Sequence, residues 1–211
     1  HVLFSVSENG VASITLNRPK ALNSLSYDML QPIGQKLKEW EHDERIALIV
    51  LKGAGTKGFC AGGDIKTLYE ARSNEVALQH AERFFEEEYE IDTYIYQYTK
   101  PIIACLDGIV MGGGVGLTNG AKYRIVTERT KWAMPEMNIG FFPDVGAAVD
   151  RRLDADEGVR VGPLEFLDRA LDGQLLGLVE HREGMMREHR CAHRTHRQAD
   201  KRQRPCSSLA F

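Results

Sequence analysis

The sequence of 211 residues is 43% hydrophobic and 27% charged, which is enough apolar material for one substantial domain with a single core. Its formal net charge of -3 gives no general electrostatic reason to expect nucleic acid or an anionic membrane as a partner. No apolar run approaches the roughly 18 residues that span a bilayer. The composition therefore predicts a soluble protein whose main partners are neither nucleic acids nor membranes.

The chain opens with signals for a hairpin and then a helix. Two short alternating segments, Val2–Val6 and Val11–Leu16, flank the turn Glu8-Asn9-Gly10, and this pattern predicts a β-hairpin. Ser26 can cap the following helix, within which Pro32 is an irregularity. The apolar positions of that helix recur at helical spacing: Met29, Leu30, Ile33, Leu37 and Trp40. We expect this helix to cover the sheet that the hairpin begins.

The middle of the chain alternates strand, turn and helix patterns. Residues 46–51 form an apolar, β-branched run of strand length, and a glycine-rich loop over 53–63 follows it. A long helical stretch covers about 74–97. After it come a strand at Ile102–Leu106, a cluster of three glycines and another strand at Tyr123–Val126. A buried strand that ends in a glycine-rich loop is a common architecture for a site.

The composition changes near residue 149. Residues 151–211 hold eleven Arg and one Lys, whereas residues 1–150 hold six Arg and nine Lys. The segment 164–179 has the pattern of an amphipathic helix, and the stretch after it is dense in Arg and His and poor in apolar residues. We therefore predict a core over 1-148 and an atypical Arg- and His-rich segment over 149-211 that is partly helical or disordered.

The cysteines and the basic tail suggest no further site. The four cysteines are widely scattered, without any CxxC pair: Cys60, Cys105, Cys191 and Cys206. Such scatter predicts thiols and no disulfides. A possible zinc-binding set lies within eight residues and lacks the paired spacing of zinc sites, so no metal site is predicted: His189, Cys191, His193 and His196. The tail lacks the interleaved aromatic residues that stack on bases, so a solvated tail is favoured over nucleic-acid binding.

Two glycine-rich loops are candidates for binding an oxygen atom. Residues 53–58 read GxGxxG after a strand, but more loop follows where a dinucleotide-binding unit requires a helix. Glycines also let backbone N–H groups approach a ligand oxygen, and two converging donors form an oxyanion hole. The loops 61–64 and 111–116 can supply such donors, the second at the start of a helix. Each loop alone is equally well interpreted as a structural turn.

Three motifs give the chain a resemblance to a known family. Residues 17–23 (NRPKALN), 58–64 (GFCAGGD) and 108–114 (GIVMGGG) resemble, in order and spacing, the motifs of the crotonase superfamily of enoyl-CoA hydratases and isomerases. The resemblance covers roughly residues 2–148. It implies an α/β fold, a spiral of ββα units that binds a coenzyme A thioester, here with a truncated or altered C-terminal helical region. It also implies a homo-oligomer, a trimer or hexamer, and no cofactor apart from the coenzyme A of the substrate.

The resemblance assigns roles to residues of the glycine loops. The backbone N–H groups of Gly63 and Gly113 are expected to form the oxyanion hole for the thioester carbonyl. The residues expected to lie along the acyl-CoA substrate come from two loops: Lys20, Ala21, Ala61, Gly62, Gly63, Asp64 and Ile65. Glu88 falls where the hydrolases of the superfamily place an acid that contacts the acyl hydroxyl. The acidic run around Glu88 is alternatively a solvated helix face.

The acidic residues favour hydrolysis over hydration. Hydratases of the superfamily carry an acid just after the glycine cluster, where this chain has Gly116, and a second acid in a later Pro-Glu pair. That pair is present with Glu136, and residues 134–146 resemble the signature of 3-hydroxyisobutyryl-CoA hydrolases, which includes Asp144. The alternative roles are a capping carboxylate for Glu136 and a turn residue for Asp144.

The function predicted is hydrolysis of a short hydroxyacyl-CoA thioester, which the resemblance narrows to 3-hydroxyisobutyryl-CoA of valine catabolism. Glu136 would attack the thioester to give a mixed anhydride, or act as general base to water, and Asp144 would orient the substrate and assist proton transfer. Cys60 has small neighbours and no nearby His in sequence, so it is interpreted as packing. The alternatives are an enoyl-CoA hydratase or isomerase, and a non-catalytic protein that binds CoA esters.

The expected location is the cytoplasm, or the mitochondrial matrix in a eukaryote. Residues 1–6 lack the charged and apolar blocks of a secretory leader. Because the sequence begins with His1 and not with Met, a targeting peptide that has been removed stays compatible with it.

Overall fold

The computed structural model describes four stretches of the chain: residues 1–70, 75–140, 144–146 and 159–160. Contacts divide the chain into two compact units, His1–Leu167 and Asp168–Phe211, and every described residue belongs to the first. Several predictions fall outside the described residues: the helix over 164–179, the His and Cys cluster of the tail, and Cys191 and Cys206. The atypical character of 149-211 therefore stays a prediction.

The predicted N-terminal hairpin is confirmed. β1 (Val2–Val6) pairs antiparallel with β2 (Val11–Leu16), with Val2 opposite Leu16. Gly10 in the turn has a φ of 76°, and a side chain there would also meet the Arg45 carbonyl oxygen at 2.5 Å. A residue without a Cβ is therefore required at this turn.

Two sheets carry the fold. The large sheet has the strand order β1-β2-β3-β5-β7-β9, and its strands are parallel from β2 onward. Its further strands are β3 (Leu48–Gly53), β5 (Ile102–Leu106), β7 (Tyr123–Val126) and β9 (Val159–Arg160). A second, parallel sheet has the order β4-β6-β8, formed by β4 (Gly58–Cys60), β6 (Ile109–Met111) and β8 (Lys131–Ala133).

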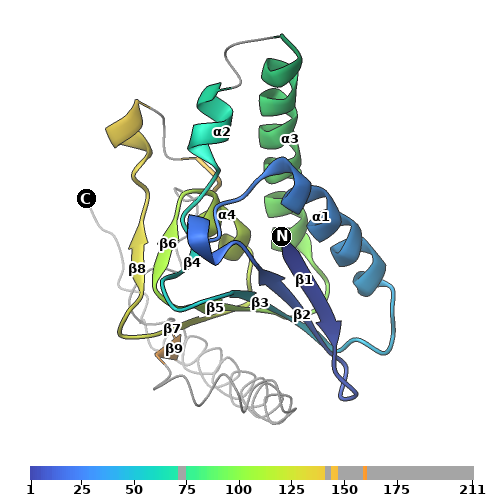
Figure 1. Ribbon diagram of the computed structural model, residues 1–211. Coiled ribbons are helices and arrows are strands. Elements are labelled where there is room, and N and C mark those ends of the chain that lie inside the picture. Colours follow the sequence, from blue (N-terminus) through green and yellow to red (C-terminus); the bar gives the residue numbers. More distant parts are fainter. Residues whose placement is uncertain (71–74, 141–143, 147–158, 161–211) are drawn as a thin grey trace, which may run out of the picture. The chain divides into compact units, whose positions relative to one another are not determined.

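The two sheets are connected by a repeated unit. In each of three repeats the first strand joins the large sheet, the second joins the small sheet and a helical segment follows (Figure 1). The helical segments are α2 (Ile65–Glu70) and α3 (Glu75–Gln97), then α4 (Gly113–Asn119), then the 3-10 helix η3 (Glu136–Ile139). This spiral of ββα units is the architecture that the family resemblance implied. Helix α3 of the first repeat packs against α4 of the second.

Helix α1 (Tyr27–Glu41) covers the sheet as predicted. Its apolar positions are buried: Met29, Leu30, Ile33, Leu37 and Trp40. Ser26 has the extended backbone of an N-cap, but its hydroxyl makes no capping hydrogen bond. The helix continues through Pro32, so the expected irregularity does not end it.

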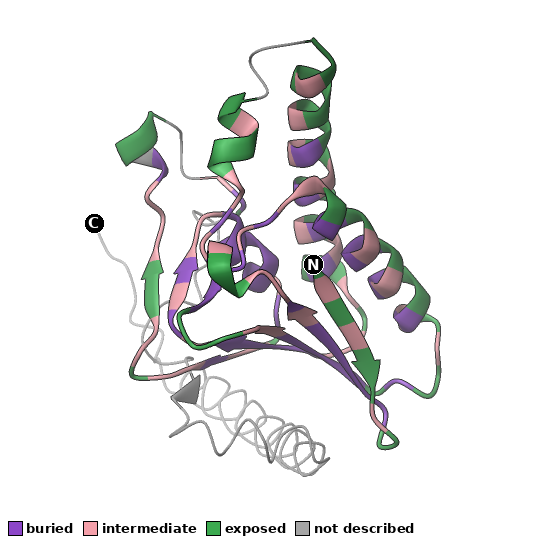
Figure 2. Cartoon of the chain, in the orientation of Figure 1, coloured by how far each residue is buried: buried purple, intermediate pink, exposed green. Residues whose placement is uncertain are grey.

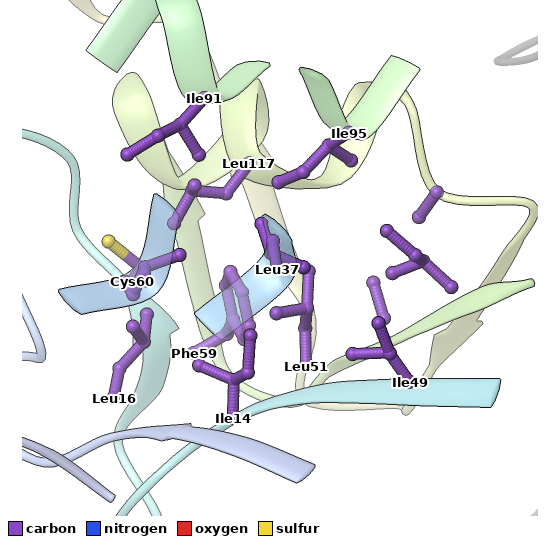
Figure 3. Packing of buried hydrophobic residues seen from close by; sticks show 14 of the residues in the cluster. Ile14, Leu16, Leu37, Ile49, Leu51, Phe59, Cys60, Ile91, Ile95 and Leu117 are labelled. Atoms are coloured by element: carbon purple, nitrogen blue, oxygen red, sulfur yellow. The ribbon is translucent and has the colours of Figure 1, made fainter. Parts of the chain in front are cut away.

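The core lies between the large sheet and the helices α1, α3 and α4. Figure 3 shows Ile14 and Leu51 of the sheet close to Leu37 of α1, with Ile95 of α3 and Leu117 of α4 above them. In Figure 2 the strands β2 and β3 and the helix α4 are buried along most of their lengths, whereas β1 and the outer face of α3 are largely exposed. The long helix α3 thus has a buried face, which packs against α1 and α4, and an opposite face that is solvated.

The two cysteines within the described part of the chain are buried, free thiols. Burial raises the pKa of both Cys60 and Cys105 to about 12, so each stays protonated at neutral pH. The interpretation of Cys60 as a packing residue agrees with this environment. Within the same described residues, no helix is both long and apolar enough to cross a membrane, and no cluster of three or more His, Cys, Asp or Glu could hold a metal ion.

Candidate active site

The first glycine loop is held in place by the motif at residues 17–23. The side-chain amide of Asn23 donates to the carbonyl oxygens of Ala54 and Gly58, each at 2.9 Å. Arg18 forms an ion pair with Asp64 at 2.8 Å. These contacts fasten the loop to the turn that follows β2, so two of the motifs that carry the family resemblance hold each other in position.

Asp64 therefore has a structural partner at the position where the resemblance predicted a contact with the substrate. Burial acts to raise the pKa of its carboxyl, but hydrogen bonds from Arg18 and from the Thr67 backbone outweigh burial, and the pKa lies below its ordinary value. The neighbouring predicted residues are accessible: Lys20 is exposed and Ala21 is half-buried, both in the 3-10 helix η1 (Pro19–Ala21).

The two glycine loops meet at the start of α4. Gly62 and Gly112 have φ values of 98° and 50°, and a side chain on Gly62 would lie 3.5 Å from the backbone nitrogen of Gly113. Among the described residues, neither the Gly63 nor the Gly113 amide donates to a backbone carbonyl. Each loop thus holds one backbone N–H without a backbone acceptor among the described residues, and two such donors are what an oxyanion hole needs.

A small cavity brings most of the predicted site residues together. Its volume is about 90 Å³, roughly the space of three water molecules. Its lining includes both loops, three carboxyl groups and apolar walls: Ala61, Gly62, Gly63, Ile65, Leu68, Phe84, Phe85, Glu88, Gly112, Gly113, Pro135, Glu136, Ile139, Asp144 and Val145. Lys20, Ala21 and Asp64 do not line it. Asp64 instead borders a neighbouring open groove of about 850 Å³, which shares the walls Leu68 and Phe84.

Glu88 enters the cavity from α3 and is closed off from solvent. Its residue is only 3% exposed, and its Oε1 atom has no hydrogen-bond partner among the described residues. Burial, and then the charges of Asp144 and Glu136, raise the pKa of Glu88 to about 8. The interpretation of Glu88 as part of a solvated helix face is therefore wrong, because this residue lies on the buried side of α3.

The raised pKa of Glu88 predicts a pH-dependent stability. Between its ordinary pKa of 4.5 and about 8, the unfolded chain releases a proton that the folded chain keeps. The stability that Glu88 contributes is fully present below pH 4.5 and is lost as the pH rises to about 8. We expect Glu88→Gln to remove this pH-dependent loss of stability, which is on the order of a few kcal/mol in the free energy of unfolding.

Urea unfolding between pH 4 and pH 9 measures this effect. Glu90→Gln is the matched control, because Glu90 is exposed on the same helix. Parallel pH curves for the Glu88→Gln variant and the unchanged chain would contradict the expectation.

Glu136 is the first residue of η3 and lies beside the second glycine loop. The residue is 8% exposed, and its Oε1 atom is 3.0 Å from the point where a Cβ on Gly112 would lie. Its Oε2 atom is buried without a partner among the described residues. Burial and the nearby Asp144 raise the pKa of Glu136 above its ordinary value, and they outweigh a backbone hydrogen bond that lowers this pKa. A raised pKa makes a carboxylate a stronger base, which suits a role in proton transfer.

Asp144 is oriented by contacts that the sequence did not reveal. The hydroxyl of Tyr89 on α3 donates to Oδ2 of Asp144. The side-chain amide of Asn119 at the end of α4 donates to the Val145 carbonyl oxygen at 2.8 Å. Val145 has a φ of 45°, which is strained for a β-branched residue. The turn that carries Asp144 is thus fastened to the same two helices that present Glu88 and Gly113.

These features together define the class of protein. A spiral of ββα units, with two glycine amides and several carboxyls around one cavity, is the crotonase fold of enzymes that act on CoA esters. A solved structure agrees: the carnitinyl-CoA dehydratase from Mycobacterium thermoresistibile is 46% identical with a TM-score of 0.64, over 69% of this chain and 42% of that chain. Residues 11–158 match the model of the Enoyl-CoA hydratase/isomerase family, and the chain belongs to that family.

Two proteins with similar sequences carry more specific names than the family does. The mitochondrial 3-hydroxyisobutyryl-CoA hydrolase of Rattus norvegicus is 53% identical over 169 residues, which are 80% of this chain and 43% of that protein. The small ribosomal subunit protein mS47 of Neurospora crassa is 42% identical over 184 residues, or 85% of this chain and 36% of that protein. The chain thus spans less than half the length of these relatives.

Proposed function

We propose that the cavity is the catalytic site of a hydrolase for short hydroxyacyl-CoA thioesters, with 3-hydroxyisobutyryl-CoA as the substrate. The observation that carries the proposal is that Glu88, Glu136 and Asp144 line the same cavity as Gly63 and Gly113. The likeness to 3-hydroxyisobutyryl-CoA hydrolases supports it. The reaction breaks the C–S bond, adds the oxygen of water to the acyl carbon and leaves a proton on the CoA sulfur.

The proposed mechanism uses each group according to its surroundings. The Gly63 and Gly113 amides stabilise the oxyanion that develops on the thioester carbonyl, and one such donor typically contributes about 3 kcal/mol. Glu136 attacks the carbonyl to form a mixed anhydride, or takes a proton from the attacking water. Asp144, held by Tyr89, orients the substrate and assists transfer of the proton to the leaving sulfur. Glu88, neutral because of its burial, contacts the acyl hydroxyl.

Hydration of an enoyl group is the less favoured chemistry. It requires a second carboxyl just after the glycine cluster, and Gly116 offers no side chain there. A side chain at this position would collide with Asp92 and would lie 2.7 Å from the Cβ of Val145. The chain therefore lacks both the acid and the room for it.

Two substrates separate the candidate functions. With the purified chain, we expect thiol release from 3-hydroxyisobutyryl-CoA and no loss of the enoyl absorbance of crotonyl-CoA. Loss of enoyl absorbance without thiol would instead identify a hydratase. If a folded sample acts on neither ester, the chain is a non-catalytic member of the family, a role compatible with its likeness to a ribosomal subunit protein.

The partner, location and assembly proposed for this activity follow from the same similarity to the hydrolases and from the family resemblance. We propose an acyl-CoA ester as the small-molecule partner and the mitochondrial matrix as the location, because the similar hydrolases are mitochondrial proteins. A homo-oligomer, trimer or hexamer, and the absence of a further cofactor stay predictions from the family resemblance.

A further inference from the structure

A fourth carboxyl group, Asp92, lies behind the cavity and has no role in the mechanism above. Asp92 follows Glu88 by one helical turn on α3, so the two side chains lie on the same face of the helix. Both of its carboxyl oxygens are closed off from solvent, and neither has a hydrogen-bond partner among the described residues. A buried polar group without a partner is rare in folded proteins and calls for an explanation.

Helix α4 is shaped to receive this carboxyl. A Cβ on Gly116 would collide with Oδ2 of Asp92, and a Cβ on Gly113, one turn earlier, would collide with Oε1 of Glu88. Two glycines three residues apart on α4 thus accommodate two acids four residues apart on α3. Gly116, which sequence reasoning interpreted only as the loss of a hydratase acid, makes room for a carboxyl that comes from another helix.

The groups around Asp92 are acidic or neutral. Glu88 precedes it on α3, Asp144 lies on the turn beside α4, and Cys60 lies on β4. Among the described residues, no cation contributes to its environment: burial, then Glu88, then Asp144 all raise the pKa of Asp92 well above its ordinary value. Burial without a cation favours the protonated form of a carboxyl, and that form has one O–H donor besides its acceptor oxygen.

We propose that Asp92 is a positioning residue of the acyl site: it lies one helical turn from Glu88 on the same face of α3, donates a hydrogen bond toward Glu88 when an acyl hydroxyl binds there, and so orients Glu88 to receive that hydroxyl. This inference rests on the proposed function and adds to it a reason why the hydroxyl of the acyl group is selected. A site built around buried hydrogen-bonding groups disfavours a ligand that leaves them unpaired, so an ester without the hydroxyl is bound and turned over less well.

The kinetic test compares two esters with the same carbon skeleton, 3-hydroxyisobutyryl-CoA and isobutyryl-CoA. The readout is the ratio of their kcat/KM values. We expect Asp92→Leu, which keeps the branching of the side chain with larger methyl groups but removes the donor, to lower this ratio at least about tenfold, the effect of one hydrogen bond. Asp92→Asn, which keeps an uncharged donor, should restore most of the preference. Asp28→Asn, on the exposed side of α1, is the control.

Two outcomes of this comparison overturn the proposal. If Asp92→Asn loses the preference as fully as Asp92→Leu, then a charged Asp92 is required. If Asp92→Leu keeps the preference, then Asp92 serves packing alone.

Two further measurements keep the inference testable if the chain hydrolyses neither ester. The infrared difference spectrum at pH 7 between the unchanged chain and Asp92→Asn should contain the carbonyl band of a protonated carboxylic acid, and a carboxylate band in its place overturns the proposal. The thermal shift caused by each ester measures binding without turnover. Equal shifts for the two esters in the unchanged chain would contradict hydroxyl selection, whereas a larger shift for the hydroxy ester that Asp92→Leu abolishes supports it.

Discussion

Replacing Glu136 by glutamine is expected to lower kcat for thiol release from 3-hydroxyisobutyryl-CoA by about 10³-fold or more, within the upper range for loss of a group that transfers protons or attacks the substrate. Glutamine keeps the shape of the side chain beside Gly112 but cannot act as a base or nucleophile. The KM should change little, because the oxyanion donors and the cavity walls stay in place. Initial rates of thiol release measure both constants.

The matched control for this experiment is Glu128→Gln. Glu128 is exposed between β7 and β8 and does not line the cavity, so its variant should keep the activity of the unchanged chain. Circular dichroism shows whether the Glu136→Gln variant is folded. A folded Glu136→Gln variant with more than about a tenth of the original kcat would remove Glu136 from the mechanism.

Replacing Gly113 by alanine is expected to lower kcat by up to about 10²-fold, the cost of a small misplacement at a catalytic site, because the added methyl group crowds the buried acid Glu88. The added Cβ would collide with Oε1 of Glu88 and lie 3.2 Å from Cδ1 of Leu25, both of which pack against the start of α4. Overpacking at such a contact also costs about 1 to 3 kcal/mol in the free energy of unfolding. Alanine keeps the backbone N–H, so the expected loss comes from the shift that the methyl group forces on the buried acid.

The control is Gly34→Ala in the middle of α1. Its nearest neighbour there would be Cγ1 of Ile91 at 3.4 Å, and alanine favours the helix more than glycine does. We expect this variant to keep its activity and nearly all of its stability in urea unfolding. If Gly113→Ala loses stability but not kcat, the position of Glu88 against α4 matters for packing and not for catalysis.

The strands and helices that the sequence predicted are those with a long enough repeat of apolar residues. Helix α1 shows five apolar residues at helical spacing, and β5 is a continuous buried run. The strands β4, β6 and β8 were not predicted, because three residues are too few to show a period of two. β4 lies inside the segment that was interpreted as one loop, and its pairing with β6 depends on residues about fifty positions away.

For the candidate site, the sequence predicted the residues but not their arrangement in space. Glu136, Asp144 and the two glycine loops follow from local motifs and their family resemblance, and both acids line one cavity with glycines of each loop. Their order along the chain cannot show which of them face one another. The tertiary structure brings Glu88 into that cavity because it turns the buried face of α3 toward α4, whereas the neighbouring Glu90 stays exposed.

Residue types and their periodicity were sufficient to predict the hairpin and the main helices, and the family resemblance of short motifs pointed to the acids, because each of these signals lies within a short stretch of chain. The supports of the site are of another kind. Tyr89 contacts Asp144 across 55 positions of the sequence, and Asn119 contacts Val145 across 26. Gly116 makes room for Asp92 of a different helix. Such contacts exist only after packing has brought separate helices together, and the orientation and the charge of the buried acids depend on them.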